Sequence, residues 1–335
     1  MTRRFAIVAA TILGAATTMT AQQAPMVTAL KAPWPERLIV EDVEILPVQK
    51  NIYLLAGAGA HVTAQIGDEG VTLVDSGERG KSAALLAAVR RLTRRPIRFL
   101  VNTGPDHDHV GGNLDIIKAA GGPSGPAGTG GNRDANENVG VMTIAHENAF
   151  NRMSAPWKDF PGLSGEALPV STFFTHRKDF HANDEGVEIL HQPAAHTDGD
   201  VLVFFRGSDV VSAGEILNTD SYPAIDLTRG GSVQGEIDAL NTLLDITIPA
   251  RNQMGGTRVV PAYGRICNEA DVLEYRDMLT IIHNRVQALI QSGATLQQVK
   301  AAKPMLEYDA TYGTNKGWTS EMFLEIVYGD LTKKK

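Results

Sequence analysis

Cysteine is almost absent from this chain: its 335 residues include one, Cys267. A single cysteine forms no intramolecular disulfide and provides no cysteine-based zinc site. None lies near residue 21 either, where an N-terminal apolar run gives way to small residues, so the sequence does not support a lipid anchor there. A disulfide scaffold and a thiolate metal centre are therefore excluded.

The chain also lacks an excess of positive charge. It has 31 lysine and arginine residues against 38 aspartate and glutamate residues, a formal net charge of -7 at pH 7. Nucleic-acid-binding proteins usually present a basic surface that neutralises phosphates, so nucleic acid is not expected as a partner. The acidic balance is compatible with binding a cation, and 43% hydrophobic residues suffice for a substantial core.

The N-terminal apolar run is short. It extends from Phe5 to about Ala16, follows Arg3 and Arg4, and is rich in alanine, whereas a membrane-spanning helix needs about 20 apolar residues. Small residues near Ala21 complete a pattern that is typical of a secretory signal peptide. We therefore expect export to the bacterial periplasm or the exterior, without stable membrane insertion. The general secretory route and the twin-arginine route both remain open.

This interpretation divides the chain into three parts. Residues 1–21 are the predicted signal peptide, residues 22–45 a proline-containing lead-in, and residues 46–335 one main domain. One domain of this size is allowed because layered α/β folds often exceed about 200 residues. Within it, the glycine-rich residues 121–140 predict a long loop, either a lid or a tolerated insertion.

Short β-like runs alternate with helical segments along the main domain. The expected strands cover residues 51–57, 61–67, 71–77, 97–102, 186–193, 201–207, 209–215 and 257–264. The expected helices cover residues 80–93, 231–247 and 268–293, and a further short helix begins at Thr295. Two halves of strands followed by helices predict two sheets packed face to face between outer helices.

The stretch NTGPDHDHVGGN, residues 102–113, is dense in groups that bind metals. Its centre reads Asp-His-Asp-His and directly follows an expected buried strand, a common place for a site in layered α/β proteins. Three further polar residues lie at the ends of expected strands, namely His196, Glu215 and Tyr263. Each is a weak signal alone, but together they form a candidate metal site.

The order of these residues resembles the metallo-β-lactamase superfamily of hydrolases. Its pattern is His-x-His-x-Asp-His, then a distant histidine, an aspartate after a strand and a histidine in a GHG-type turn. The segments AHENAFNRM, AHTDGD, YPAID, GGS and EYRDM are similar to elements that recur in secreted members. The resemblance covers about residues 46–285. It implies an α/β fold, a four-layer αββα sandwich with a C-terminal helical extension from about residue 268.

The chain departs from this pattern within the first motif. The flanking NT and VGGN fix the register, so the two leading histidines fall on Gly104 and Asp106. Asp108 and His109 match the pattern, and His107 occupies a variable position. The resemblance therefore implies that two of the usual ligands survive in this loop and that one is exchanged for a carboxylate.

The later ligand positions are also altered. The distant histidine matches His196, the later aspartate is replaced by Glu215, and the last histidine is replaced by Tyr263. Tyrosine binds a metal only as a phenolate, which is costly from a pKa near 10, so a hydrogen-bonding role is favoured for it. Three further residues either orient a ligand or cap a strand end: Asp75, Thr103 and Asp198.

The resemblance implies two metal positions, and this chain supplies a different number of ligands to each. The first keeps only Asp106 and His196, fewer than the three protein ligands that a catalytic zinc usually has. The second keeps Asp108 and His109 and gains Glu215, whose extra methylene lengthens its reach. The expected cofactor is Zn²⁺, as one or two ions. Mn²⁺ and Fe²⁺ are alternatives because carboxylates suit harder ions.

The resemblance implies a hydrolase that acts on a small molecule. A metal-bound hydroxide, oriented by Asp108, would attack the carbonyl carbon of an ester, lactone, thioester or amide, β-lactams included. Tyr263 or Asn218 would donate a hydrogen bond to the developing oxyanion.

Two other functions remain open. A member that has exchanged its leading and last histidines could keep the fold and bind a ligand without catalysis. The carboxylate at Asp106 also resembles the iron-dependent oxidoreductase branch of the superfamily, which has glutamate at that position. Nothing in the sequence indicates the oligomeric state.

Overall fold

The computed structural model describes residues 38–124, 140–253 and 255–333. The predicted signal peptide, most of the lead-in and most of the glycine-rich segment lie outside the described residues. None of the helices in the described part of the chain is both long and apolar enough to cross a membrane.

The first sheet contains eight strands in sequence order. They are β1 (Leu38–Val40), β2 (Val43–Gln49), β3 (Ile52–Ala56), β4 (Val62–Gly67), β5 (Gly70–Val74), β6 (Ile97–Val101), β7 (Met142–His146) and β8 (Ser171–Phe173). Neighbours from β1 to β5 are antiparallel, and neighbours from β5 to β8 are parallel. Residues 38–45, placed in the lead-in from the sequence, already belong to this sheet.

The second sheet has five strands in the order β13-β12-β11-β10-β9. They are β9 (Arg177–Ala182), β10 (Glu185–Gln192), β11 (Asp200–Phe205), β12 (Val210–Asn218) and β13 (Arg258–Tyr263). Only the pair β12 and β13 is parallel within this sheet. The sequence does not predict β9, because its segment RKDFHA is mostly polar and most of its side chains are not buried.

Apolar side chains from both sheets form one layer between them. Leu54, Val74 and Val101 of the first sheet cluster with Val187 and Ile189 of β10, and each is at most 1% exposed. Burying a side chain of this size contributes roughly 1.5–3 kcal/mol. The two sheets are therefore held face to face by their inner faces.

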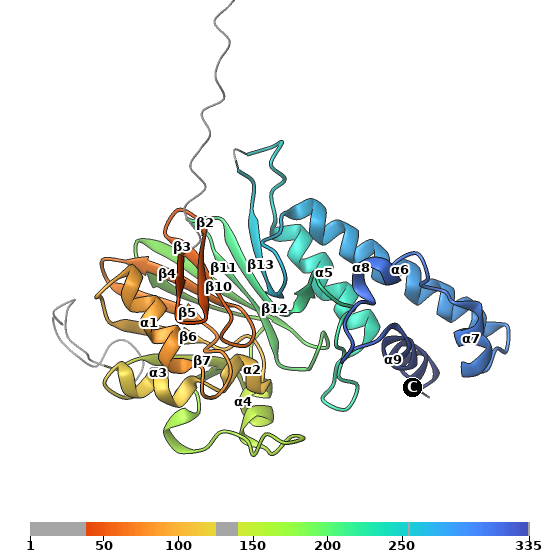
Figure 1. The fold of residues 1–335 in the computed structure, drawn as a ribbon, viewed down its shortest axis with the longest axis horizontal. Coiled ribbons are helices and arrows are strands. Elements are labelled where there is room, and N and C mark those ends of the chain that lie inside the picture. Colours follow the sequence, from red (N-terminus) through yellow and green to blue (C-terminus); the bar gives the residue numbers. More distant parts are fainter. Residues whose placement is uncertain (1–37, 125–139, 254, 334–335) are drawn as a thin grey trace, which may run out of the picture. The chain divides into compact units, whose positions relative to one another are not determined.

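Helices cover the outer face of each sheet (Figure 1). They are α1 (Ser82–Leu92) and α3 (Asn113–Ala119) on the first sheet, and α5 (Val233–Ile246) and α6 (Glu269–Gln291) on the second. Leu85 and Ile116 pack onto the first sheet, and Leu240 and Leu279 onto the second. The predicted four-layer αββα sandwich is confirmed.

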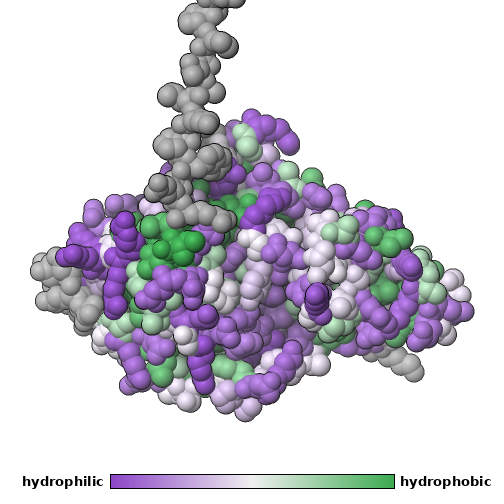
Figure 2. Space-filling model, viewed as in Figure 1, coloured by the Kyte–Doolittle hydropathy of each residue, from purple (hydrophilic) through white to green (hydrophobic). Residues whose placement is uncertain are grey.

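The predicted C-terminal helical extension is also confirmed. After α6 come α7 (Leu296–Ala302), α8 (Asp309–Tyr312) and α9 (Ser320–Thr332). Phe323 of α9 stacks on Tyr222 with a centroid distance of 4.8 Å, so the extension packs against the segment that follows β12. On the face shown in Figure 2, polar residues predominate, and apolar residues gather beside the first strands and over the C-terminal helices.

Candidate functional site

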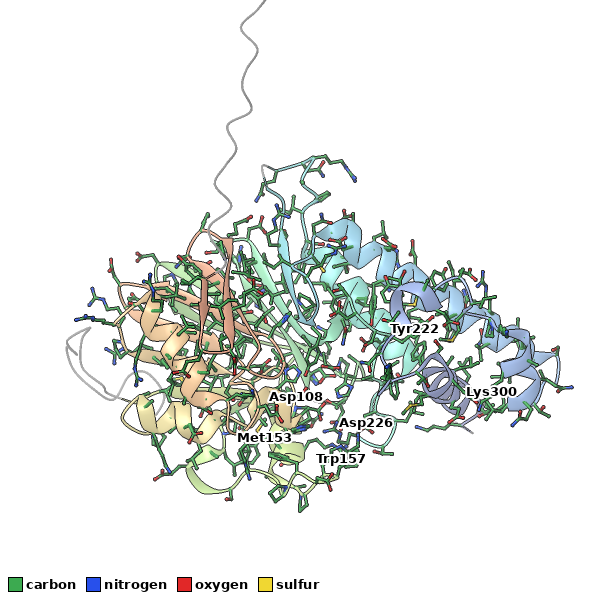
Figure 3. The ribbon with its side chains drawn as sticks, viewed as in Figure 1. Asp108, Met153, Trp157, Tyr222, Asp226 and Lys300 are labelled. Atoms are coloured by element: carbon green, nitrogen blue, oxygen red, sulfur yellow. The ribbon has the colours of Figure 1, made fainter. Side chains whose placement is uncertain are left out.

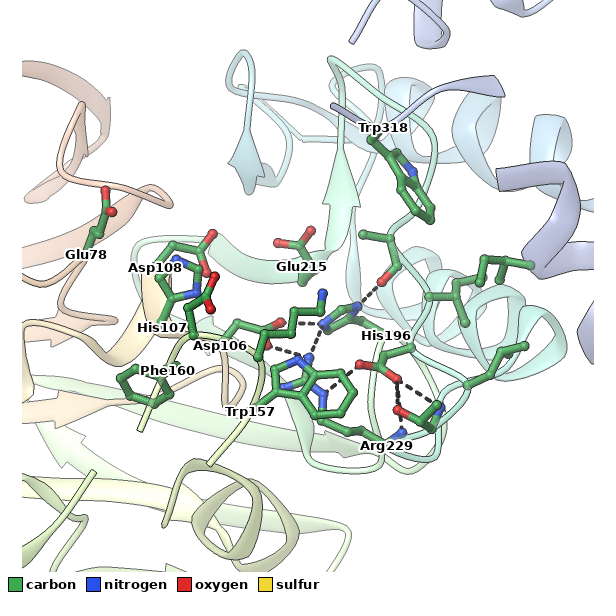
Figure 4. Close-up of a pocket in the computed structure, with 18 of the residues that line it drawn as sticks. Glu78, Asp106, His107, Asp108, Trp157, Phe160, His196, Glu215, Arg229 and Trp318 are labelled. Carbon is green, nitrogen blue, oxygen red and sulfur yellow. Dashed lines mark hydrogen bonds and ion pairs between the residues drawn. The ribbon is translucent and has the colours of Figure 1, made fainter. Parts of the chain in front are cut away.

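The predicted site residues come from separate strand ends and meet in one cavity. The motif follows β6 and opens the short helix α2 (His107–Val110), His196 follows β10, and Glu215 lies near the end of β12. The cavity has a volume of about 800 Å³, and Asp106, Asp108, His196 and Glu215 line it (Figure 4). Three segments that are distant in the sequence therefore supply one polar site.

Close backbone packing holds the motif against the end of β5. The Ser76 amide donates to the His109 carbonyl at 2.8 Å, and the Gly112 amide donates to the Gly77 carbonyl at 3.0 Å. A Cβ on Gly112 would lie 2.2 Å from the Ser76 carbonyl oxygen, so a side chain does not fit there. The glycine permits the close approach that positions α2, and with it His109.

Arg229 joins two of the predicted ligands. Its Nη2 lies 2.5 Å from Oδ1 of Asp106 and 3.5 Å from Nε2 of His196. Nε2 of His196 lies 2.5 Å from Oδ2 of Asp106, and Nε of Arg229 donates to Oδ2 of Asp226 at 2.8 Å. We call these four residues the Arg229 cluster. Their side chains are at most 19% exposed, so solvent screens their charges only weakly.

The charges within the Arg229 cluster fix its protonation. Burial favours the neutral form of Asp106, but His196 and Arg229 outweigh it and hold the pKa of that carboxyl well below its usual range. Burial likewise opposes a charge on His196, but Asp106 outweighs it and raises the pKa of the imidazole to about 10. At neutral pH His196 is therefore a cation, with Nδ1 donating to the Ala224 carbonyl and Nε2 donating to Asp106.

Carboxylates hold His109 on both sides. Its Nδ1 lies 2.8 Å from Oδ2 of Asp75, and its Nε2 lies 3.2 Å from Oε2 of Glu215. Thr103 fixes Asp75 by donating from its amide at 2.8 Å and from its hydroxyl at 2.6 Å. Burial opposes a charge on His109, but Asp75 and Glu215 outweigh it and raise its pKa. The imidazole is thus oriented with Nε2 toward a residue of the cavity.

Tyr263 is paired with Asp108. The tyrosine hydroxyl donates a hydrogen bond to Oδ2 of that carboxylate. Burial first, and then the charge of Asp108, raise the pKa of Tyr263 above its ordinary value. At neutral pH the tyrosine is therefore a neutral hydrogen-bond donor.

Two further carboxyl groups are buried near His196. Asp200 accepts hydrogen bonds from the amide and the hydroxyl of Thr197, at 2.5 and 2.9 Å, and burial raises its pKa to about 6. Glu236 of α5 is fully buried, and neither of its oxygens has a hydrogen-bond partner among the described residues. Burial, followed by the charge of Asp200, raises the pKa of Glu236 well above its usual value.

Aromatic and apolar side chains form much of the cavity wall. Trp157 and Phe160 lie in the loop after α4 (Glu147–Ser154), and Trp318 and Ile326 belong to the C-terminal extension. Figure 4 shows the two indole rings on opposite sides of the acidic residues, and Figure 3 places Trp157 near Asp108 at one end of the sandwich. The polar groups therefore lie in a cleft with largely apolar walls, which is the usual character of a small-molecule site.

The comparison with known families agrees with this architecture. The sequence model of the metallo-β-lactamase superfamily matches residues 46–301, more than half of the chain. The chain belongs to this superfamily. The resemblance seen in the sequence is thereby confirmed.

Solved structures of other superfamily members share the fold at low sequence identity. A metallo-β-lactamase from Pontibacter korlensis is 16% identical with a TM-score of 0.52, and the match covers 71% of this chain and 99% of that chain. The sec-alkylsulfatase Pisa1 from Pseudomonas sp. is 14% identical with a TM-score of 0.59, over 85% of this chain and 49% of that chain. A metallo-β-lactamase from Hirschia baltica is 13% identical with a TM-score of 0.52, over 72% and 98%. No curated protein sequence matches the chain significantly.

The first of the two metal positions does not fit a metal ion. Asp106 and His196 are in direct contact, and they are the only two predicted ligands at this position, fewer than the three protein ligands that a catalytic zinc usually has. The guanidinium of Arg229 already supplies the positive charge beside Asp106. A cationic side chain of the protein therefore takes up this position.

The second position provides a more suitable donor set. His109 Nε2 and Glu215 Oε2 lie 3.2 Å apart, a spacing that two ligands of one ion can adopt, and Asp75 supports the imidazole as carboxylates commonly support metal-binding histidines. The third donor, Asp108, is engaged by Tyr263. Across the described residues, no group of three or more histidine, cysteine, aspartate or glutamate side chains is already arranged to hold a metal ion.

Three of the residues singled out in the sequence lie apart from these contacts. Asp198 forms a two-pronged ion pair with Arg152, at 3.2 and 2.9 Å, and makes no hydrogen bond to the predicted ligands within the described chain. The Asn218 side chain accepts from the Asp220 amide at 3.0 Å, which engages it in the local turn. His107 lines the cavity, with its ring 6.2 Å from that of Phe160.

Sequence reasoning missed Arg229, both tryptophans of the wall and Glu236. A single arginine in the turn DLTRGGS has no distinguishing pattern, although the adjacent GGS is one of the segments that carry the resemblance. The tryptophans lie far from the motifs in the sequence. Glu236 is at a helical position where a polar residue would ordinarily face solvent.

Proposed function

We propose that this protein is a hydrolase of a small molecule, acting on an ester, lactone, thioester or amide carbonyl with one divalent ion held by Asp108, His109 and Glu215. The observation that supports the proposal most directly is the orientation of His109, whose Nδ1 is fixed by Asp75 while its Nε2 faces Glu215 at 3.2 Å. Zinc is the proposed ion, and Mn²⁺ or Fe²⁺ would suit the two carboxylates as well.

A divalent ion in such a site lowers the pKa of water toward 7 and stabilises negative charge on a carbonyl oxygen. The chain's own residues prepare this chemistry. Asp75 and Thr103 hold the His109 ring, and Asp108 is positioned to accept a proton from a water molecule in the cavity. Tyr263 stays a neutral phenol. Its single O–H is given to Asp108, and it would serve a developing oxyanion by turning from that carboxylate toward the cavity.

The cavity walls favour a substrate with an apolar body. A volume of about 800 Å³ accommodates a molecule of drug-like size, and the indole rings of Trp157 and Trp318 offer flat apolar surfaces. Their bulk also excludes water from the region beside Glu215, which strengthens electrostatic interactions there. A β-lactam falls within this class, as do aromatic esters and lactones.

The metal assignment is tested by removing its ligands. Protein purified without added metal should contain close to one equivalent of a divalent ion, and the double variant Asp108→Ala/His109→Ala should contain almost none. The matched control His107→Ala alters a neighbour in the same helix that is not a proposed ligand, so its metal content should match the wild type. Elemental analysis measures the metal content of each protein, and a screen of esters, lactones and β-lactams measures its hydrolytic activity. Equal metal loss in both variants would contradict the ligand set.

A second candidate function is supported by the internal pairing of the donors. Asp106 is paired with Arg229 and His196, and Asp108 with Tyr263, so the described cavity is electrostatically complete without an ion. In that case the protein binds a small molecule without hydrolysing it. Less than a tenth of an equivalent of metal, with no gain in thermal stability on adding Zn²⁺, Mn²⁺ or Fe²⁺, would support this function. A coloured, oxygen-sensitive iron protein would instead indicate an oxidoreductase.

We also propose that the protein acts in the periplasm or outside the cell. The support is the N-terminal sequence, with Arg3 and Arg4 ahead of a short apolar run. Mass spectrometry of the N-terminus of the exported protein tests it, with removal of about the first 21 residues as the expected result.

A further inference from the structure

The side chain of Arg229 is a deeply buried cation that three different segments enclose. It is 7% exposed, and it contacts Asp106 from the motif loop and Asp226 from its own turn. Its guanidinium carbon also lies 4.8 Å from the centroid of the Trp157 ring, within the range of a cation–π interaction. One side chain thus contacts both Asp106, which lines the cavity, and Trp157 of the aromatic wall.

Backbone hydrogen bonds hold the turn that carries Arg229 against the segment that carries His196. Its carbonyl accepts from the Asp198 amide at 3.0 Å, and the Asp226 amide donates to the His196 carbonyl at 2.9 Å. A Cβ on Gly231 would lie 2.2 Å from the His196 carbonyl oxygen, so only glycine allows the turn to approach this segment. The turn is therefore fastened to the His196 segment independently of the arginine side chain.

We propose that Arg229 is a positioning residue that replaces a metal ion in the first position. Its guanidinium holds Asp106 and His196, which a divalent ion would otherwise join. It also fixes Trp157 on the cavity wall. A guanidinium is always protonated and offers a planar fork of donors that suits carboxylates. This half of the cavity then keeps its geometry without any metal. The inference does not depend on hydrolysis, since it holds equally for a protein that only binds its ligand.

The first test removes the Arg229 guanidinium by substitution and then adds free guanidinium to replace it. Arg229→Ala leaves Asp226 buried without its counter-charge and leaves Asp106 paired with His196 alone, and breaking a buried ion pair in this way is strongly destabilising. We expect the Tm to fall by roughly 5–10 °C in a chain of this size. Millimolar guanidinium, far below denaturing concentrations, should restore most of this loss by occupying the vacated space. Arg229→Lys, which keeps the charge without the fork, should lie between the two proteins.

The matched control is Arg152→Ala. This arginine also makes a two-pronged ion pair, with Asp198, but its side chain is 37% exposed and does not line the cavity. Its removal should lower the Tm only slightly, and guanidinium should not restore the difference. Rescue of both variants would show a general effect of the added ion and would overturn the inference.

Tryptophan fluorescence reports whether Arg229 positions Trp157 on the cavity wall. Arg229→Ala should shift the tryptophan emission spectrum, because Trp157 loses the cation stacked on its ring, and guanidinium should reverse the shift. In a Trp157→Phe background the same substitution should produce no shift. A shift that persists in that background would mean that Arg229 does not position Trp157.

The decisive test counts metal ions. Under this inference Asp106 holds no metal, so Asp106→Asn has the same number of ions per chain as the wild type, whether that number is one or zero. A wild type with two ions, of which Asp106→Asn or His196→Ala loses one, would overturn the inference. This measurement also covers the case in which Arg229→Ala does not fold. A wild type without any ion would instead refute the proposed metallo-hydrolase and leave the role of Arg229 intact.

Discussion

The charged residues in and beside the cavity differ chiefly in whether their charge is paired. Asp106 and Asp108 each have a partner, and His109 lies between two carboxylates. Glu236 is the exception, because it is fully buried and its oxygens have no hydrogen-bond partner within the described chain. A carboxylate in such surroundings is costly to ionise, so burial raises the pKa of Glu236 well above its usual value.

We therefore expect Glu236→Gln to stabilise the protein increasingly as the pH rises. The folded pKa of Glu236 is raised above its unfolded value near 4.3, so its contribution to stability is fully present below about pH 4 and is lost as the pH rises toward the folded pKa. Glutamine has no such dependence and a similar shape. Denaturant unfolding at several pH values measures the difference between the two proteins.

An exposed replacement, Glu166→Gln, is the control for general loss of negative charge. If the stability difference between Glu236→Gln and the wild type is the same at pH 5 and at pH 8, Glu236 is not protonated in the folded state and the interpretation of its burial is wrong.

Helices and strands with a clear apolar period are the elements that the sequence predicts best. The long helix was expected over residues 268–293, and α6 spans Glu269–Gln291. It begins at a capping box in which Asn268 accepts from the Asp271 amide while the Asp271 side chain accepts from the Asn268 amide. These contacts use local sequence alone, so they are readable without a tertiary structure.

Removing this cap should cost stability without affecting the cavity. Asn268→Ala leaves amides of the first turn without an acceptor, and we expect the free energy of unfolding to fall by about 1 kcal/mol. Asn268→Ser, which retains a capping oxygen, should remain close to the wild type. Urea unfolding of the three proteins checks this, and an equal loss for alanine and serine would show that the cap is not the cause.

At the scale of the whole molecule, the cavity is completed by parts that lie far apart in the chain. Trp157 follows α4, whereas Trp318 comes from the extension beyond the sandwich, and the indole of Trp318 donates to the Tyr222 carbonyl at 3.0 Å. The extension is thus part of the ligand site as well as of the fold. Its tryptophan is half-buried and presents one face to the cavity.

Trp318→Ala should weaken the binding of an apolar substrate. Losing one aromatic wall removes roughly 1–2 kcal/mol of contact, which raises KM about tenfold while kcat changes little, because the ring does not touch the proposed reacting groups. Steady-state kinetics with a substrate from the screen, or a dissociation constant for its unreactive analogue, measures the effect. Met322→Ala, in the same extension but outside the cavity, should leave KM unchanged; an equal effect of both would indicate a general disturbance of the extension.

Most of the fold was accessible from the sequence, and the site only in part. The runs that form β3 to β6 and β10 to β13 are apolar and are separated by turns or by a single amphipathic helix, so local pattern and burial agree. The strand β9 is not predicted from the sequence, because its mostly polar side chains show no apolar periodicity. Asp108 and His109 were identifiable from their spacing, whereas Arg229 and Glu236 carry no local signal.

The sequence by itself determined the alternation of strands and helices, because apolar periodicity specifies which face of each element is buried. The resemblance of its motifs to the superfamily indicated the layered sandwich, and the motif loop fixed which donor types are available. Only the tertiary structure decided how those donors are paired. Whether Asp106 faces a metal ion or an arginine depends on the turn that brings Arg229 across from residues more than a hundred positions away. Such long-range contacts arise from packing geometry, which no local pattern records.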